Sequence, residues 1–189
     1  MDSHAVHVLN MPILLGTLRE GRNSEKVAQY ILLEAQKRGI NTEILDVKEM
    51  GLPLFDGKAS PAVLEWSAKM KDADGLIVVA PEYNHSYPSA LKNALDYLYV
   101  EYAKKPMGIC GVSMGPFGGA RMIEQLKLVA VELHMVAIRE AMYFPNVSTL
   151  FDAKGKIKSK DYEKFCNDFF GELVWYARAL KAARGESPQ

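Results

Sequence analysis

The segment GTLREGRNS, residues 16–24, combines the residue types that bind a phosphate group. Besides two glycines five positions apart, which permit a tight turn, it holds the hydroxyl and guanidinium groups of Thr17, Ser24, Arg19 and Arg22. An amphipathic run begins at about Asn23, so the unpaired N–H groups of a helix N-terminus would face the same turn. These features predict an anion site. An ordinary loop, in which Asn23 or Ser24 caps the helix and both arginines face solvent, stays open as the alternative.

The same segment has the G-x-x-x-x-G spacing of a nucleotide-binding P-loop. Arg22 and Asn23 stand where that motif requires Lys and then Ser or Thr. Without the lysine and the magnesium-binding hydroxyl, a phosphotransferase is a weak hypothesis. The dinucleotide fingerprint G-x-G-x-x-G is also missing from this loop.

A second segment, PEYNHSYPSALKNALDYL at residues 81–98, begins where a fully apolar run stops. Pro81 and Pro88 stiffen it, and a rigid loop with backbone N–H groups and an aromatic ring suits a flat heterocycle. A plain strand-to-helix turn with Tyr83 packed inward is the alternative. His85 has no ligand-like partner and no nucleophile beside it, so we expect it to form a loop hydrogen bond rather than to act as a general base.

A third segment, SMGPFGGARMIEQLK at residues 113–127, repeats the theme. Its glycines permit a close approach of the backbone to a ligand, and the helix that follows points its N-terminus back toward the same place. Such an approach is what a ring edge with carbonyl acceptors requires.

The elements that must position these loops alternate between short apolar runs and longer runs of helical period. We expect strands at 11–17, 42–47, 75–83, 106–113 and 136–144. We expect helices at 24–38, 61–71, 89–101, 119–133 and 161–183. This pattern predicts a single doubly wound α/β domain over residues 1–189, with a five-stranded parallel sheet and helices on both faces. The flavodoxin-like order 2-1-3-4-5 would bring together the loops after strands one, three and four.

Composition narrows the class of ligand. The chain has 189 residues, 49% of them hydrophobic, and a formal net charge of zero, which favours a small-molecule partner over nucleic acid. Cys110 and Cys166 lack CxxC spacing, so neither a disulfide framework nor a metal site is expected. The longest uncharged stretch, residues 3–18, contains His, Asn and Pro and follows no basic region. We therefore predict a cytoplasmic protein without a membrane segment.

The three segments together resemble the NADPH-dependent FMN reductases, a flavodoxin-like family that includes quinone, azo-dye and chromate reductases. The resemblance covers about residues 13–144 and rests on GTLREGRNS, on PEYN with the following P-x-x-LKNALD, and on GPFGGARMIEQL. The second of these is the most specific, because its length and content are hard to reach by chance. Arg22 departs from the family, whose members often have a small hydroxyl residue there, and the chain after about residue 148 is not diagnostic.

The resemblance implies a set of contacts to FMN. Those to the phosphate would come from Thr17, Arg19, Asn23 and Ser24. Those bordering the isoalloxazine ring would come from Pro81, Glu82, Tyr83 and Asn84. Those on its far side would come from Ser113, Gly115, Phe117, Gly118 and Gly119.

The implied activity is that of an FMN-dependent NAD(P)H oxidoreductase. Hydride would pass from NADPH, or from NADH, through FMN to a quinone, azo, metal or flavin acceptor in a ping-pong cycle. No side chain is expected to be catalytic, and Glu82 and Lys92 are expected to be structural or interfacial. The alternative is a non-enzymatic flavodoxin-like electron carrier, which would need a charged docking face that a net charge of zero does not favour.

The expected helix at 89–101 predicts a homo-oligomer, either a dimer or a tetramer. One apolar stripe, which the sheet can bury, consists of Leu91, Leu95, Leu98 and Tyr102. Three further apolar residues lie off that stripe, namely Tyr97, Tyr99 and Val100. A second subunit would cover them, unless the helix is simply sunk deeper in its own core.

Overall fold

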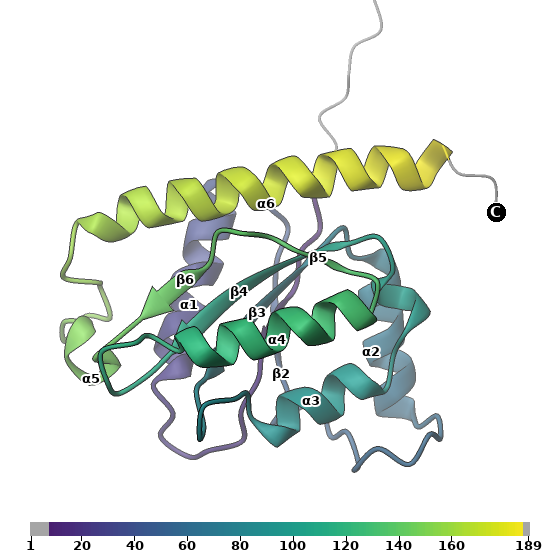
Figure 1. Cartoon of the computed structure of the whole chain (residues 1–189), viewed down its shortest axis with the longest axis horizontal. Helices are drawn as coiled ribbons and strands as arrows, with labels where there is room; N and C mark the ends of the chain where they lie inside the picture. Colours follow the sequence, from purple (N-terminus) through teal and green to yellow (C-terminus); the bar gives the residue numbers. More distant parts are fainter. Residues whose placement is uncertain (1–7, 187–189) are drawn as a thin grey trace, which may run out of the picture.

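The computed structural model describes residues 8–186 and contains one parallel sheet (Figure 1). Its strands are β1 (Ile13–Leu15), β2 (Ile44–Asp46), β3 (Leu76–Pro81), β4 (Pro106–Val112), β5 (Val136–Ala137) and β6 (Met142–Phe144). The order is β2-β1-β3-β4-β5, with β6 also paired to β4. The predicted order 2-1-3-4-5 is therefore confirmed. Residues 3–7 of the long uncharged stretch lie outside the described part, and the extent of the domain stays a prediction.

The helices are α1 (Ser24–Lys37), α2 (Pro61–Asp72), α3 (Ser89–Asp96), α4 (Ala120–Glu132), α5 (Val147–Leu150) and α6 (Asp161–Glu186), with a 3-10 turn at Val100–Tyr102. Local signals explain several boundaries. Ser60 caps α2 by accepting a hydrogen bond from the Val63 N–H at 3.3 Å, and Pro61 follows at the first helical position. Gly39 has φ +71° directly after α1, a conformation that glycine adopts without strain. Within residues 8–186, no helix is long and apolar enough to cross a membrane.

Side chains of each strand alternate between two hydrophobic cores, one on each face of the sheet. In β3, Ile77 and Val79 belong to the core beneath α1 and α6, whereas Leu76 and Val78 belong to the core beneath α2, α3 and α4. This is the period-two pattern of a strand that is buried on both faces. Helices on both faces were predicted, and the structure confirms them.

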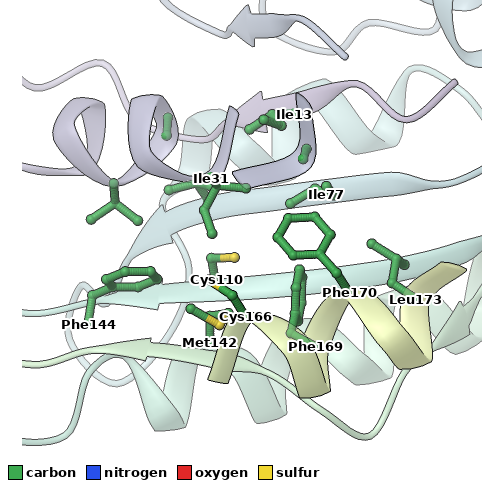
Figure 2. Packing of buried hydrophobic residues seen from close by; sticks show 14 of the residues in the cluster. Ile13, Ile31, Ile77, Cys110, Met142, Phe144, Cys166, Phe169, Phe170 and Leu173 are labelled. Carbon is green, nitrogen blue, oxygen red and sulfur yellow. The ribbon is translucent and has the colours of Figure 1, made fainter. Parts of the chain in front are cut away.

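Helix α6, for which the sequence suggested no role, packs on the same face of the sheet as α1. In Figure 1 it is the long yellow helix along the top of the view, and Figure 2 shows Phe169 and Phe170 pointing from it into the core. Both rings are 1% exposed. Gly108 of β4 makes this contact possible, because a Cβ there would lie 2.6 Å from Cζ of Phe169.

The expected strand at 136–144 is two strands, so that prediction was wrong in detail. Ala137 pairs with Met107 of β4, and Met142 pairs with Cys110 of β4. The chain therefore advances five residues from Ala137 to Met142 while β4 advances only three. The extra residues lie between the two strands. Among them, Glu140 donates its backbone N–H to Glu172 of α6 at 2.6 Å.

The expected helix at 89–101 is also interrupted. Helix α3 ends at Asp96, and Tyr99 has φ −142° and ψ −63°, which no α-helix contains. The predicted apolar stripe is nevertheless buried, since Leu91, Leu95 and Tyr102 are all 0% exposed.

Candidate functional site

A cavity of about 460 Å³ lies at the carboxyl edge of the sheet, between the loops that follow β1, β3 and β4. Its lining residues are Arg19, Gly21, Arg22, Asn23, Ser24, Pro81, Glu82, Tyr83, Val112, Ser113, Met114, Gly115, Phe117, Arg121 and Val147. The volume is within the range of pockets that bind small ligands and cofactors. The topology thus brings together the three segments that the sequence indicated, although they are far apart along the chain.

The first loop presents an unpaired hydroxyl at a helix N-terminus. Ser24 is 2% exposed, and within residues 8–186 its Oγ has no hydrogen-bond partner. Asn23 occupies the N-cap of α1 without a side-chain capping bond. Neither side chain therefore forms the capping bond that the alternative of an ordinary loop requires. A buried polar atom without a partner is costly, and a bound anion would supply that partner.

Arg22 lines the cavity, but its charge is already engaged. Its side chain is 3% exposed and forms ion pairs with Asp46 and with Glu25, the latter at 2.9 Å. It also donates a hydrogen bond to the carbonyl of Thr17. Arg22 therefore braces the loop against β2 and α1, which explains why a large cation fits at this position. Arg19, in contrast, is exposed and makes no ion pair among the described residues, so its charge is available to a ligand.

Two hydroxyls join the first loop to the second. Oγ1 of Thr17 lies 3.0 Å from Oη of Tyr83, and Thr17 is 1% exposed. Thr17 therefore lies behind the cavity wall and holds Tyr83 in place. Asn84, Gly118 and Gly119 also lie outside the lining. The other nine residues that the family resemblance suggested line the cavity.

The two glycines outside the lining serve internal packing. A Cβ on Gly119 would lie 2.7 Å from Cα of Gly111, and a Cβ on Gly118 would lie 2.8 Å from Cβ of Tyr143. Both have positive φ, +60° at Gly118 and +83° at Gly119. They let the third loop lie directly on β4 and β6. Ser113 stabilises the loop, accepting from the Gly118 N–H at 2.9 Å and donating to the Gly115 carbonyl at 2.8 Å.

Arg121 lines the cavity but was not among the predicted contacts to FMN. Its Nε lies 2.9 Å from Oε1 of Glu82, and its backbone N–H donates to Oε2 at 3.1 Å. Its guanidinium also lies over the ring of Phe117, 4.8 Å from the centroid. The sequence contained one signal for this role, since an arginine two residues after a pair of glycines falls at the N-terminus of the expected helix. Glu82 thus joins the second loop to α4.

The second loop ends in a strained hairpin. Tyr83 and Ser86 exchange two backbone hydrogen bonds, of 2.9 and 3.0 Å. The two residues between them have positive φ, +49° at Asn84 and +68° at His85. This geometry usually selects Gly at one of these positions. The His85 ring contacts Arg121, in line with a hydrogen-bonding role.

The protein's thiols are not suited to chemistry. Cys110 and Cys166 both lie in the core beneath α6, and burial raises the pKa of each thiol above its ordinary value. Within residues 8–186, no group of three or more His, Cys, Asp or Glu side chains is arranged to hold a metal ion.

A parallel sheet of this order, with a helix that begins at the end of the loop after β1 and a cavity between the loops after β3 and β4, defines the flavodoxin-like class of proteins. The chain belongs to the NADPH-dependent FMN reductase family, whose model matches residues 10–149. It is therefore an oxidoreductase that uses FMN and takes its electrons from NAD(P)H.

Individual relatives agree with the family. The chain is similar to a 2-hydroxy-1,4-benzoquinone reductase of a Burkholderia species, 29% identical over 180 residues, covering 90% of this chain and 97% of the relative. It is similar to an NAD(P)H-dependent FMN reductase of Pseudomonas aeruginosa, 32% identical over 178 residues, covering 88% and 94%. Its fold is similar to FerB, a flavoenzyme NAD(P)H:(acceptor) oxidoreductase from Paracoccus denitrificans, with a TM-score of 0.79 and 24% identity over 91% of this chain and 98% of that one.

Proposed function

We propose that the chain transfers hydride from NADPH to a quinone-type acceptor in a ping-pong cycle, with FMN held in the cavity between the three loops. When bound, FMN supplies the redox chemistry by accepting a hydride and passing on electrons in a separate half-reaction. The observation that carries the proposal is the buried, unpartnered hydroxyl of Ser24 at the N-terminus of α1.

The first loop would bind the FMN phosphate through charge and hydrogen bonds. Ser24 donates its hydroxyl, the first N–H groups of α1 point to the same place, and Arg19 adds a free positive charge. Arg22 holds the loop in shape rather than meeting the phosphate, because Asp46 and Glu25 neutralise it. Glu82, Tyr83 and the third loop would flank the ring.

Quinones are the acceptors we favour within the wider group of azo, metal and flavin acceptors. The rim of the cavity carries two exposed apolar side chains, Met114 at 62% and Phe117 at 60%. The planar apolar ring of a quinone can stack on such a rim, whereas a metal oxyanion gains nothing from it. The name of the Burkholderia relative supports the same class.

Stopped-flow measurements of the two half-reactions test this function. We expect NADPH to bleach the bound flavin without an acceptor, and a benzoquinone to restore its colour after NADPH is consumed. Steady-state rates at several fixed quinone concentrations should give parallel double-reciprocal lines. Converging lines would contradict the ping-pong cycle, and faster reoxidation by chromate than by quinone would contradict the acceptor class.

Removal of phosphate contacts tests the site. We expect Arg19→Ala and Ser24→Ala each to weaken FMN binding about ten- to a hundredfold, because a charge-assisted hydrogen bond contributes roughly 1.5 to 3 kcal/mol. Riboflavin, which lacks the phosphate, should bind both variants as it binds the parent. Glu20→Gln is the matched control, since Glu20 is in the same loop but pairs with Lys48 at 2.7 Å. Wild-type FMN affinity in both alanine variants would show that the loop does not bind the phosphate.

A further inference from the structure

A wide basic groove lies next to the cavity, between α1 and the turn at residues 152–160. Its volume is about 1440 Å³, and seven cationic side chains but only three carboxylates line it. The chain as a whole has a formal net charge of zero, so this excess is local. Four of the cations occupy every second position of the turn, at Lys154, Lys156, Lys158 and Lys160.

The turn that carries these lysines is anchored in the core. Phe151 pairs with Ile157 across it, and both are buried, at 8% and 7% exposure. Oδ1 of Asp152 accepts the backbone N–H groups of Lys154 and Lys156 at 2.8 and 2.9 Å. The side chains of these two lysines form no ion pair within residues 8–186. The backbone of the turn is therefore held in place, and the charges of these two lysines remain available to an anion.

The lining of the groove is joined to the lining of the cavity by two contacts. On one wall, Nζ of Lys26 lies 3.4 Å from Oδ1 of Asn23, which lines the cavity. On the other wall, Nζ of Lys158 donates to the carbonyl of Thr149 at 2.9 Å, in the helix that begins at Val147 of the cavity lining. A ligand that extends out of the cavity past α1 would enter this groove.

The side of the groove formed by α1 has an apolar centre and charged ends. Lys26 and Lys37 lie roughly 16 Å apart along the helix, and Lys37 pairs with Glu34 of the same lining at 2.6 Å. Leu33, between them, is 55% exposed. A surface of this kind fits a ligand with a flat apolar base and attached phosphates better than it fits a simple inorganic anion.

We propose that the groove binds the adenosine end of NADPH, with the 2′-phosphate on Lys154 and Lys156 and the adenine over Leu33. This inference rests on the proposed function, in which the nicotinamide end enters the cavity. NADH lacks the 2′-phosphate, so the turn at residues 152–160 sets the preference of the enzyme for NADPH.

The double variant Lys154→Gln/Lys156→Gln tests the inference. Calorimetry with adenosine 2′,5′-bisphosphate should show about three- to tenfold weaker binding, because each exposed charge pair contributes modestly. The KM for NADPH should rise by the same factor, while the KM for NADH stays unchanged. Lys164→Gln is the matched control, since Lys164 is an exposed lysine of α6 outside the groove and pairs with Asp168 at 2.6 Å.

Several results would overturn the inference. One is an absence of bisphosphate binding to the parent protein. Another is a double variant whose KM values for NADPH and NADH change equally. A third is a double variant whose bisphosphate affinity and KM for NADPH equal those of the parent. The proposed function fails separately, if the parent protein with FMN oxidises neither nucleotide. The calorimetric titration still reports on the groove in that case, because it needs no turnover.

Discussion

At the scale of single residues, Glu82 resembles a catalytic acid or base because it is a carboxylate in the cavity wall, but its contacts indicate a structural role. It lies in the cavity wall, 9% exposed, but both of its oxygens are occupied by Arg121. Its position explains the shape of the site rather than the movement of a proton. Lys92 is engaged in the same way, since its Nζ lies 2.5 Å from Oδ1 of Asp96.

We predict that Glu82→Gln keeps the rate of flavin reduction by NADPH within about threefold of the parent and lowers the free energy of unfolding by about 1 to 3 kcal/mol. The stability loss is expected because the ion pair and the helix cap both weaken. Arg121→Gln should cost a similar amount, and the double variant should cost less than the sum. A large fall in the reduction rate with FMN still bound would contradict this structural role.

The buried Lys105 makes the free energy of unfolding depend on pH. It is 6% exposed and donates to the carbonyls of Met70 and Lys71 at the end of α2, the latter at 3.1 Å. Burial, with Arg184 nearby, lowers its pKa to about 8. Between this pKa and the ordinary lysine pKa of 10.5, the unfolded chain binds more protons at this site than the folded chain. The contribution of Lys105 to stability must therefore increase as the pH rises through that window.

We predict that the stability of the parent relative to Lys105→Met increases between pH 8 and pH 10.5 by on the order of 1 to 3 kcal/mol. Chemical denaturation of both proteins across this range measures it. Subtracting the variant removes the contributions of tyrosines and cysteines that titrate in the same window. Parallel stability curves would show that Lys105 is not desolvated in the folded protein.

At the scale of elements, the packing of α6 on β4 depends on one glycine. We predict that Gly108→Ala destabilises the protein by about 1 to 3 kcal/mol, because the new Cβ would overlap the buried ring of Phe169. Gly171→Ala is the matched control, since a Cβ there meets nothing within 4 Å and lies inside α6. That change should stabilise by up to about 1 kcal/mol through helix propensity. Equal thermal denaturation midpoints for the two variants would show that α6 adjusts to the extra methyl group.

At the scale of the whole molecule, apolar side chains remain exposed on the face covered by α3 and α4. Tyr99 and Val100 are 48% and 74% exposed, and Leu128 and Val131 of α4 are 68% and 69% exposed. His134 joins the two groups, because its Nε2 lies 3.0 Å from Oη of Tyr99. Tyr97 is covered by the chain itself, since its hydroxyl donates to the carbonyls of residues 53 and 54. The remaining surface supports the predicted homo-oligomer.

We predict a dimer, or a tetramer built of two dimers, by light scattering at micromolar concentration. Val131→Glu should shift the mass to that of a monomer, because two buried carboxylates would face each other across a twofold interface. Trp175→Glu, at an exposed position of α6 on the other face of the sheet, should leave the dimer intact. A monomeric parent protein would contradict the prediction.

Local patterns in the sequence determined the elements and the edge of the sheet where the site lies. Alternating apolar runs and helical periodicity encode which face of an element is buried, and parallel strands bring their carboxyl ends to one edge. The sequence alone therefore identifies the three loops that meet at the site. The same patterns predicted that Leu91, Leu95 and Tyr102 are buried.

Only the tertiary structure decided which side chains pair with one another. Arg22 pairs with Asp46, which lies 24 residues away in the sequence, and this contact decides that its charge does not meet a ligand. The hydrogen bond between Thr17 and Tyr83 joins residues that are 66 positions apart. The division of the last strand into β5 and β6 depends on how α6 docks beside β4, and no local pattern contains that information. Burial is encoded by the residue itself and its near neighbours, whereas the choice of partner is made by distant segments that meet only in the folded chain.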